Sequence, residues 1–250
     1  MKYVDWVYMS LLATILIAGD LRAKADPADV SALVSGVRAL GYEIPEFAQM
    51  SAACDGDAMC AARFLKDSIG PGAEIVPADT SRPARTGWSN RDTPLRVAPE
   101  ISTGAIVIEL ARFDSSFLST VFNRLAILPK KIILDVRGLA MSDELGELRR
   151  TVSLFTGKRD RAFRLIYPSG RQVDWQIPQP PSQWGDIDIT VRVNDQTPGN
   201  GMAFAALLAR YADAKIEGAA IPDTIYLRRV VPIMHGWDML LPRAEVQFPK

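Results

Sequence analysis

Histidine and cysteine are scarce in this sequence, which has one histidine, His235, and two cysteines, Cys54 and Cys60. Imidazole and thiolate are the ligands that most transition-metal sites use. So small a set argues against such a site, and we expect no metal. The sequence also has no Gly-x-Gly-x-x-Gly stretch and no phosphate-binding loop of the Walker type. No sequence motif therefore indicates nucleotide binding, and no cofactor is expected.

A net charge is also missing. The 29 lysines and arginines balance the 29 aspartates and glutamates. Proteins that bind nucleic acids need a basic excess or a basic patch to meet the phosphates. We therefore expect no nucleic-acid partner.

Long apolar runs are absent except for residues 6–19 near the N-terminus. This run is shorter than the roughly 20 apolar residues that span a bilayer. Lys2 precedes it, and Ala23-Lys24-Ala25 follows with small residues where a signal peptidase reads. The pattern predicts a secretory signal over residues 1–25, cleaved after Ala25, and a periplasmic or secreted protein with no stable membrane span. The alternative is an uncleaved anchor.

The two cysteines are an even count in a chain predicted to be exported, which favours a Cys54–Cys60 disulfide. The five residues between them, Asp-Gly-Asp-Ala-Met, can turn the chain back on itself. A redox or metal pair is the weaker alternative, because the spacing is not Cys-x-x-Cys and no histidine is near.

Residues 26–72 have a helical pattern. Asp26-Pro27 fits a helix N-cap followed by proline at the first helical position. Apolar residues then recur at helical spacing before Gly41, namely Val30, Leu33, Val34, Val37 and Leu40. Two more helices are expected, at 45–53 and 57–69. Residues 73–103 are rich in proline, serine, threonine and arginine, and predict a linker or an extended arm.

Residues 104–250 alternate apolar runs with amphipathic stretches, which predicts an α/β core. Buried strands are expected at 105–110, 131–136 and 187–193. Helices are expected at 115–128, 144–155 and 201–214. A hairpin is expected at 163–176, and further strands at 224–229 and 243–248.

Polar residues follow two of these buried strands, where sites in α/β proteins lie. The candidate binding residues are Asp135, Arg137, Asn194, Thr197, Gly199 and Asn200. Asp135 and Arg137 either shape a site or form a buried salt bridge that fixes a loop. Gly199 and Asn200 open a helix whose free amides could hold a carboxylate. Alternatively, glycine there lets the helix start close to the sheet.

The order of these segments resembles the core of the C-terminal processing peptidases, also called tail-specific serine peptidases. Ile106 to Phe113 is similar to the first strand and its phenylalanine-bearing loop. Leu134-Asp135-Val136-Arg137 is similar to the Leu-Asp-Leu-Arg strand end, and Val193-Asn194-Asp195-Gln196-Thr197 to the turn before the long helix. The resemblance covers residues 104–249 and implies a Clp-peptidase/crotonase-like fold with a mixed sheet and flanking helices.

The resemblance fails at the residues that carry the chemistry. The family uses a serine nucleophile and a lysine base, and these positions fall on Gly199 and Thr224. The glycine pair that helps form the oxyanion hole is also missing, because Gly138-Leu139-Ala140-Met141 stands there. The family's PDZ domain has no room in the chain. Losing nucleophile, base and oxyanion glycine together implies a relative without catalytic activity.

Two functions follow as hypotheses. The first is an exported scaffold that binds a peptide or an envelope protein, for example by strand addition. The second is an active serine-type hydrolase with another residue set, with Thr197, Ser142 and His235 as candidates, together with Asp195. His235 fits a turn between two strands better than a triad. Relatives of this fold often form trimers or hexamers, and the sequence leaves the oligomeric state open.

Overall fold

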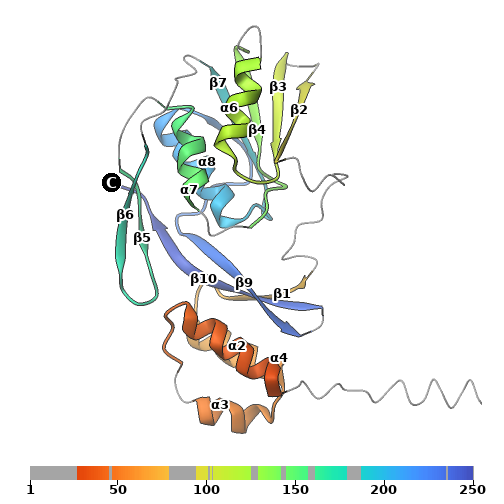
Figure 1. The fold of residues 1–250 in the computed structure, drawn as a ribbon, viewed down its shortest axis with the longest axis vertical. Coiled ribbons are helices and arrows are strands. Elements are labelled where there is room, and N and C mark those ends of the chain that lie inside the picture. Colours follow the sequence, from red (N-terminus) through yellow and green to blue (C-terminus); the bar gives the residue numbers. More distant parts are fainter. Residues whose placement is uncertain are drawn as a thin grey trace, which may run out of the picture.

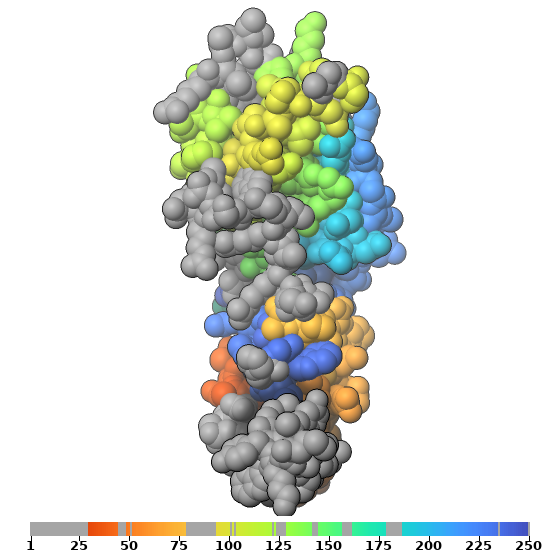
Figure 2. Space-filling model, turned by 90° about the vertical axis from the view of Figure 1, so that its right-hand side faces the viewer, coloured from red at the N-terminus to blue at the C-terminus, as the bar shows by residue number. Residues whose placement is uncertain are grey.

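The computed structural model describes residues 27–44, 47–78, 94–100, 102, 104–124, 129–141, 145–156, 161–178, 187–234 and 236–249. The α/β part of the chain lies at one end of an elongated molecule and three N-terminal helices lie at the other, with a long hairpin between them (Figure 1). In the view turned by 90°, dark blue atoms of the hairpin lie in the lower part, beside the orange atoms of the N-terminal region (Figure 2).

The first sheet carries the two segments singled out in the sequence. Its strands run in the order β2-β3-β4-β7-β8, where β3, β4, β7 and β8 are parallel and β2 is antiparallel to β3. Their bounds are Leu95–Glu100, Ala105–Leu110, Lys131–Asp135, Asp188–Val193 and Lys215–Gly218. The predicted α/β class with a mixed sheet is confirmed.

Helices α6 (Ser115–Arg124), α7 (Leu145–Ser153) and α8 (Gly199–Tyr211) accompany this sheet (Figure 1). Side chains of the central strands, such as Ile108, Leu134 and Val191, share one core with Leu148 and Phe204 of the helices. Each of these five side chains is almost fully buried. Burial of such a side chain stabilises the fold by roughly 1.5–3 kcal/mol, which explains the apolar run of β4 and the apolar residues at alternate positions of β7.

A second sheet has the order β1-β10-β5-β6, and β9 pairs with the other edge of β10. The bounds are β1 Glu74–Pro77, β5 Arg161–Ile166, β6 Gln172–Gln176, β9 Ile225–Met234 and β10 Trp237–Gln247. β10 changes partner along its length, from β1 at residues 237–240 to β5 at residues 245–247. The sequence predicted only the parts of β9 and β10 that enter the α/β core.

The N-terminal helices α2 (Pro27–Ala39), α3 (Phe47–Cys54) and α4 (Ala58–Ile69) form a second core with the far end of the hairpin. Leu33 and Leu65 of the helices are buried in the same cluster as Ile233, Met239 and Leu241 of the hairpin. The nearer residues of the same hairpin belong to the α/β core, namely Ile225, Leu227, Ala244 and Val246. One pair of strands therefore contributes to both cores.

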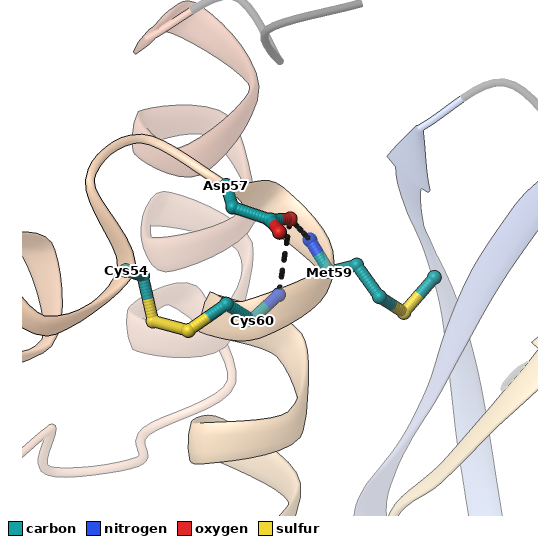
Figure 3. The surroundings of a disulfide bond; sticks show 4 residues. All are labelled: Cys54, Asp57, Met59 and Cys60. Carbon is teal, nitrogen blue, oxygen red and sulfur yellow. Dashed lines mark hydrogen bonds between the residues drawn. A yellow bond between two sulfur atoms is a disulfide. The ribbon is translucent and has the colours of Figure 1, made fainter. Parts of the chain in front are cut away.

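The predicted disulfide joins Cys54 at the end of α3 to Cys60 in the first turn of α4, with a Cα–Cα distance of 5.4 Å. Between them, Asp57 caps α4 by accepting hydrogen bonds from the Met59 and Cys60 amides at 2.8 and 3.2 Å (Figure 3). Such a cap satisfies donors that the first helical turn leaves free. The predicted pairing of Cys54 with Cys60 is confirmed.

Candidate functional site

β4 and β7 are neighbours in the sheet, and Asp135 lies opposite Arg192 in the register. The polar segments that follow the two strands therefore meet at one edge. Asp135 is 8% exposed and accepts hydrogen bonds from the Arg137 amide at 3.1 Å, from its Nε at 2.9 Å and from its Nη2 at 2.6 Å. Hydrogen bonding to Asp135 raises the pKa of Arg137. The pair thus fixes the loop after β4.

A small cleft of about 290 Å³ opens beside this pair, lined by Arg137, Arg192, Val193, Glu217 and Gly218. Arg192 donates to Glu217 at 2.9 Å and to Glu100 at 2.8 Å. With Asp135 included, three carboxylates therefore surround two guanidinium groups. Because the negative charges outnumber the positive ones, this cleft does not favour an anionic ligand.

In the turn after β7, the polar groups form hydrogen bonds with one another. The Thr197 hydroxyl donates to Asn194 Oδ1 at 3.0 Å and accepts from the Asn194 amide at 2.9 Å. The Gln196 amide donates to Asn194 Oδ1 at 3.1 Å. Thr197 is 7% exposed. Its hydroxyl therefore serves the turn, and the group that accepts its proton is a neutral amide.

Gly199 begins α8 and lies against the backbone of β9. A Cβ atom at this position would lie 1.9 Å from the Tyr226 carbonyl oxygen and 2.9 Å from its carbonyl carbon. No side chain fits there unless one of the two backbones moves. The residue expected at the family's nucleophile position is thus a glycine in a place that is sterically closed.

Thr224, on which the sequence resemblance puts the family's base, is exposed and lies two residues before Tyr226. The close approach of Gly199 to Tyr226 brings the start of α8 beside the segment that follows Thr224. Among the described residues, no lysine amine forms a hydrogen bond with a serine or threonine hydroxyl; Lys215, for example, bonds to Asp188. Ser142 and His235, the other residues proposed for a hydrolase, lie outside the described residues.

Asn200 joins α8 to the loop where the oxyanion glycines of the family would lie. Its side chain is 2% exposed, and its Nδ2 donates to the Ala140 carbonyl oxygen at 3.1 Å. Its Oδ1 is buried without a hydrogen-bond partner among the described residues. Gly201 allows this close packing, because a Cβ there would lie 2.7 Å from Thr197 Cγ2.

A larger cleft, of about 560 Å³, is lined by residues of α7 and of the second sheet. It was not predicted, because its walls come from segments far apart in the chain. They are Leu145, Gly146, Glu147, Arg150, Leu165, Tyr167, Trp175, Leu227, Arg243 and Ala244. The one sequence signal was the pair of aromatic residues in the hairpin, Tyr167 and Trp175.

Glu147 is held in place at the edge of this cleft. One of its oxygens accepts from the Ser115 amide at 3.1 Å and from the Ser115 hydroxyl at 2.8 Å, and the other accepts from Arg150. Burial acts to raise the pKa of Glu147, but these hydrogen bonds outweigh it and the pKa is lowered. The carboxylate therefore ties α7 to the first turn of α6.

Within the described ranges, no group of three or more histidine, cysteine, aspartate or glutamate side chains is arranged to hold a metal ion. Nor does any described helix have the length and apolar character needed to cross a membrane.

No protein-family model and no curated protein matches the sequence. Solved structures do match. A presumed peptidase from Parabacteroides merdae is 8% identical with a TM-score of 0.54, over 90% of this chain and 85% of that chain. The photosystem II D1 C-terminal processing protease is 14% identical with a TM-score of 0.44, and an S41 protease from Bacteroides fragilis is 13% identical with a TM-score of 0.45.

The match to the Parabacteroides structure shows a shared peptidase-like fold along most of both chains. The fold predicted from the strand-end segments is therefore confirmed. The chain spans less than half of the D1 processing protease and of the Bacteroides protease, at 44% and 48% of their lengths.

Proposed function

We propose that this chain is an exported protein that has the fold of a C-terminal processing peptidase and binds peptides or envelope proteins without cutting them. The main observation in support of this proposal is the contact between Gly199 and Tyr226. A Cβ atom at Gly199 would lie 1.9 Å from the carbonyl oxygen of Tyr226. Covalent peptide hydrolysis needs a nucleophile beside a base. Here the nucleophile position has neither the side chain nor the space for one.

The remaining candidates for a nucleophile support the same proposal. The Thr197 hydroxyl donates its proton to the Asn194 side chain, which is not a base. Thr224 has no amine to replace the lysine of the family, and it is exposed. Removal of the nucleophile or its base from such a pair typically lowers the rate by several powers of ten.

Export is part of the proposal and rests on two observations. Residues 1–25 have the pattern of a secretory signal. Cys54 and Cys60 form a disulfide, a bond that persists in oxidising compartments outside the cytosol.

The test combines a binding assay with an activity assay on the same purified protein. The protein is titrated with a library of peptides that have free C-termini, and the peptides are recovered and weighed by mass spectrometry. Separately, the protein is treated with a fluorophosphonate probe beside an active serine peptidase. We expect bound, uncut peptides and no labelling. Cleaved peptides, or a probe attached to Thr197 or Ser142, would establish the active serine-type hydrolase instead, whereas an absence of any bound peptide or envelope protein would refute the binding function.

A further inference from the structure

The cleft between α7 and the second sheet has the size and the walls of a ligand site. Its volume of about 560 Å³ lies within the roughly 300–1,000 Å³ of most small-ligand pockets. Leu165 of β5, Trp175 of β6 and Leu227 of β9 supply an apolar wall. The opposite wall begins at Gly146 in the first turn of α7, where a Cβ would meet no atom within 4 Å. The cleft thus has room for an apolar side chain.

Arginines give one end of this cleft a positive charge. Arg150 lines it with a side chain that is 65% exposed, and Glu147 is the one carboxylate that pairs with it among the described residues. That carboxylate is also held by Ser115. The guanidinium of Arg150 therefore keeps N–H groups for an incoming acceptor.

Arg149 does not line the cleft, but it lies over the lining residue Trp175 and adds a second positive group with which no described carboxylate pairs. Its guanidinium lies 4.2 Å from the centre of the Trp175 ring, and its Nη1 donates to the Gln176 carbonyl oxygen at 3.0 Å. Its Nε is buried without a partner among the residues that the structure describes. Burial and then the charge of Arg150 lower the pKa of Arg149. A carboxylate near this pair of arginines would relieve their mutual repulsion.

The second sheet offers backbone groups beside the same wall. β6 is the last strand in the order β1-β10-β5-β6, so its outer edge has no partner among the described strands. An extended peptide can pair with such an edge and direct alternate side chains to the face on which Trp175 lies. A free alkyl chain cannot use these hydrogen bonds. The combination fits the end of a peptide better than a fatty acid.

We propose that this cleft holds the C-terminal residue of a bound peptide, with the terminal carboxylate at Arg150 and an apolar side chain among Leu165, Leu227 and Trp175. Arginine pairs with a carboxylate through two parallel N–H groups. The proposal deepens the peptide-binding function above, rests on it, and moves the ligand away from the closed position at Gly199.

The test uses a fluorescein-labelled peptide of mixed apolar sequence that ends in leucine, either with a free carboxylate or amidated. Binding to the purified protein is followed by fluorescence anisotropy. We expect amidation and the variant Arg150→Gln each to weaken binding about tenfold, the value of one charge-assisted hydrogen bond. Gly146→Phe should abolish binding, because Gly146 lines the cleft and a Cβ there has open space, so the ring would occupy the room of the ligand.

Matched controls separate this site from general effects. Arg164→Gln removes an exposed arginine that also pairs with one carboxylate, Asp174, but lies on the opposite face of β5 from Leu165. Gly138→Phe makes the same glycine substitution where a Cβ also has open space, on the loop after β4. Both variants should bind the peptide as the unchanged protein does. Circular dichroism and thermal unfolding establish that all four variants are folded.

Each outcome decides one point. Full binding by Gly146→Phe and Arg150→Gln, or equal binding of the free and amidated peptides, overturns the C-terminal site and leaves the peptide-binding function standing. Displacement of the peptide by an equal concentration of decanoate shows a fatty-acid site and also overturns it. If no peptide of either form binds, the proposed function itself fails.

Discussion

At the scale of single residues, Gly199 differs from Gly138 and Gly146, although sequence reasoning would treat the three glycines alike. A Cβ atom at Gly138 or Gly146 would lie in open space, but at Gly199 the carbonyl group of Tyr226 occupies its place. The sequence showed that a serine is absent. It could not show that the space for one is absent, because Tyr226 comes from a strand that begins 26 positions later in the chain.

We predict that Gly199→Ala lowers the free energy of unfolding by at least about 2 kcal/mol, because one backbone must move to admit the methyl group. Gly138→Ala, the control, should change it by less than about 0.5 kcal/mol. Urea unfolding followed by tryptophan fluorescence measures both. By the same reasoning, Gly199→Ser combined with Thr224→Lys should not cleave peptides. If the two alanine variants had equal free energies of unfolding, β9 would be able to move at little cost, which would contradict the prediction.

At the scale of elements, the interior strands were predictable and the hairpin was not. β4 has the continuous apolar run Ile132-Ile133-Leu134, and β7 has apolar residues at every second position, Ile189, Val191 and Val193, so both strands could be recognised. Arg228, Arg229 and Pro232 instead interrupt the apolar pattern of β9, and Asp238 and Pro242 interrupt that of β10. Pro232 is tolerated because β10 is the one described strand that pairs with β9. Partner exchange along β10 has no local sequence signal.

The hydrogen bonds between Ser115 of α6 and Glu147 of α7 predict that the stability of the fold depends on pH. The hydrogen bonds from Ser115 and Arg150 outweigh burial, so the folded pKa of Glu147 lies below its usual 4.5. A lowered folded pKa stabilises the native state above the unfolded pKa, and this contribution is lost as the pH falls through the folded value. The stability lost in Glu147→Gln should therefore be about 1 kcal/mol at pH 7 and should shrink as the carboxylate becomes protonated in acid.

Urea unfolding at a series of pH values measures this difference. Asp223→Asn changes an exposed acid outside the cleft and is the control, with a small difference expected at every pH. A Glu147→Gln deficit that stays constant from pH 7 to pH 3 would contradict the assigned role of the carboxylate.

The disulfide between α3 and α4 gives a second prediction at this scale. Replacing both Cys54 and Cys60 with alanine should cost about 2 kcal/mol, because the unfolded chain regains the freedom that the crosslink removes. A reductant should shift the unfolding midpoint of the unchanged protein in the same direction and leave the double variant unaffected. A reductant that shifts neither would mean that the bond adds nothing to stability.

At the scale of the whole molecule, the β9–β10 hairpin joins the two cores. Ile233, Met239 and Leu241 are buried with the N-terminal helices, and Leu227 and Val246 with the α/β part. Residue patterns gave the helices and the α/β region separately. Their connection depends on contacts between residues some 200 positions apart, such as the hydrogen bond from the Tyr42 hydroxyl to the Pro242 carbonyl oxygen.

We predict that the molecule unfolds in one transition and that Leu241→Ala shifts all of it. Removal of this fully buried side chain should cost roughly 2–5 kcal/mol. Circular dichroism of the helices and tryptophan fluorescence should give the same midpoint before and after the change. Val97→Ala, at a side chain that is 40% exposed, is the control and should have little effect. Two separate midpoints would show that the hairpin does not couple the cores.

The contact between Gly199 and Tyr226 also has an evolutionary consequence. A glycine codon becomes a serine codon by one nucleotide change, so an absent nucleophile alone would be easily regained. Here the strand has taken the place of the side chain. A nucleophilic side chain at this position would need β9 to shift first, and that shift would disturb a hairpin on which two cores depend. Selection acting on one substitution at a time would therefore find no intermediate that is folded and also has a nucleophile at this position.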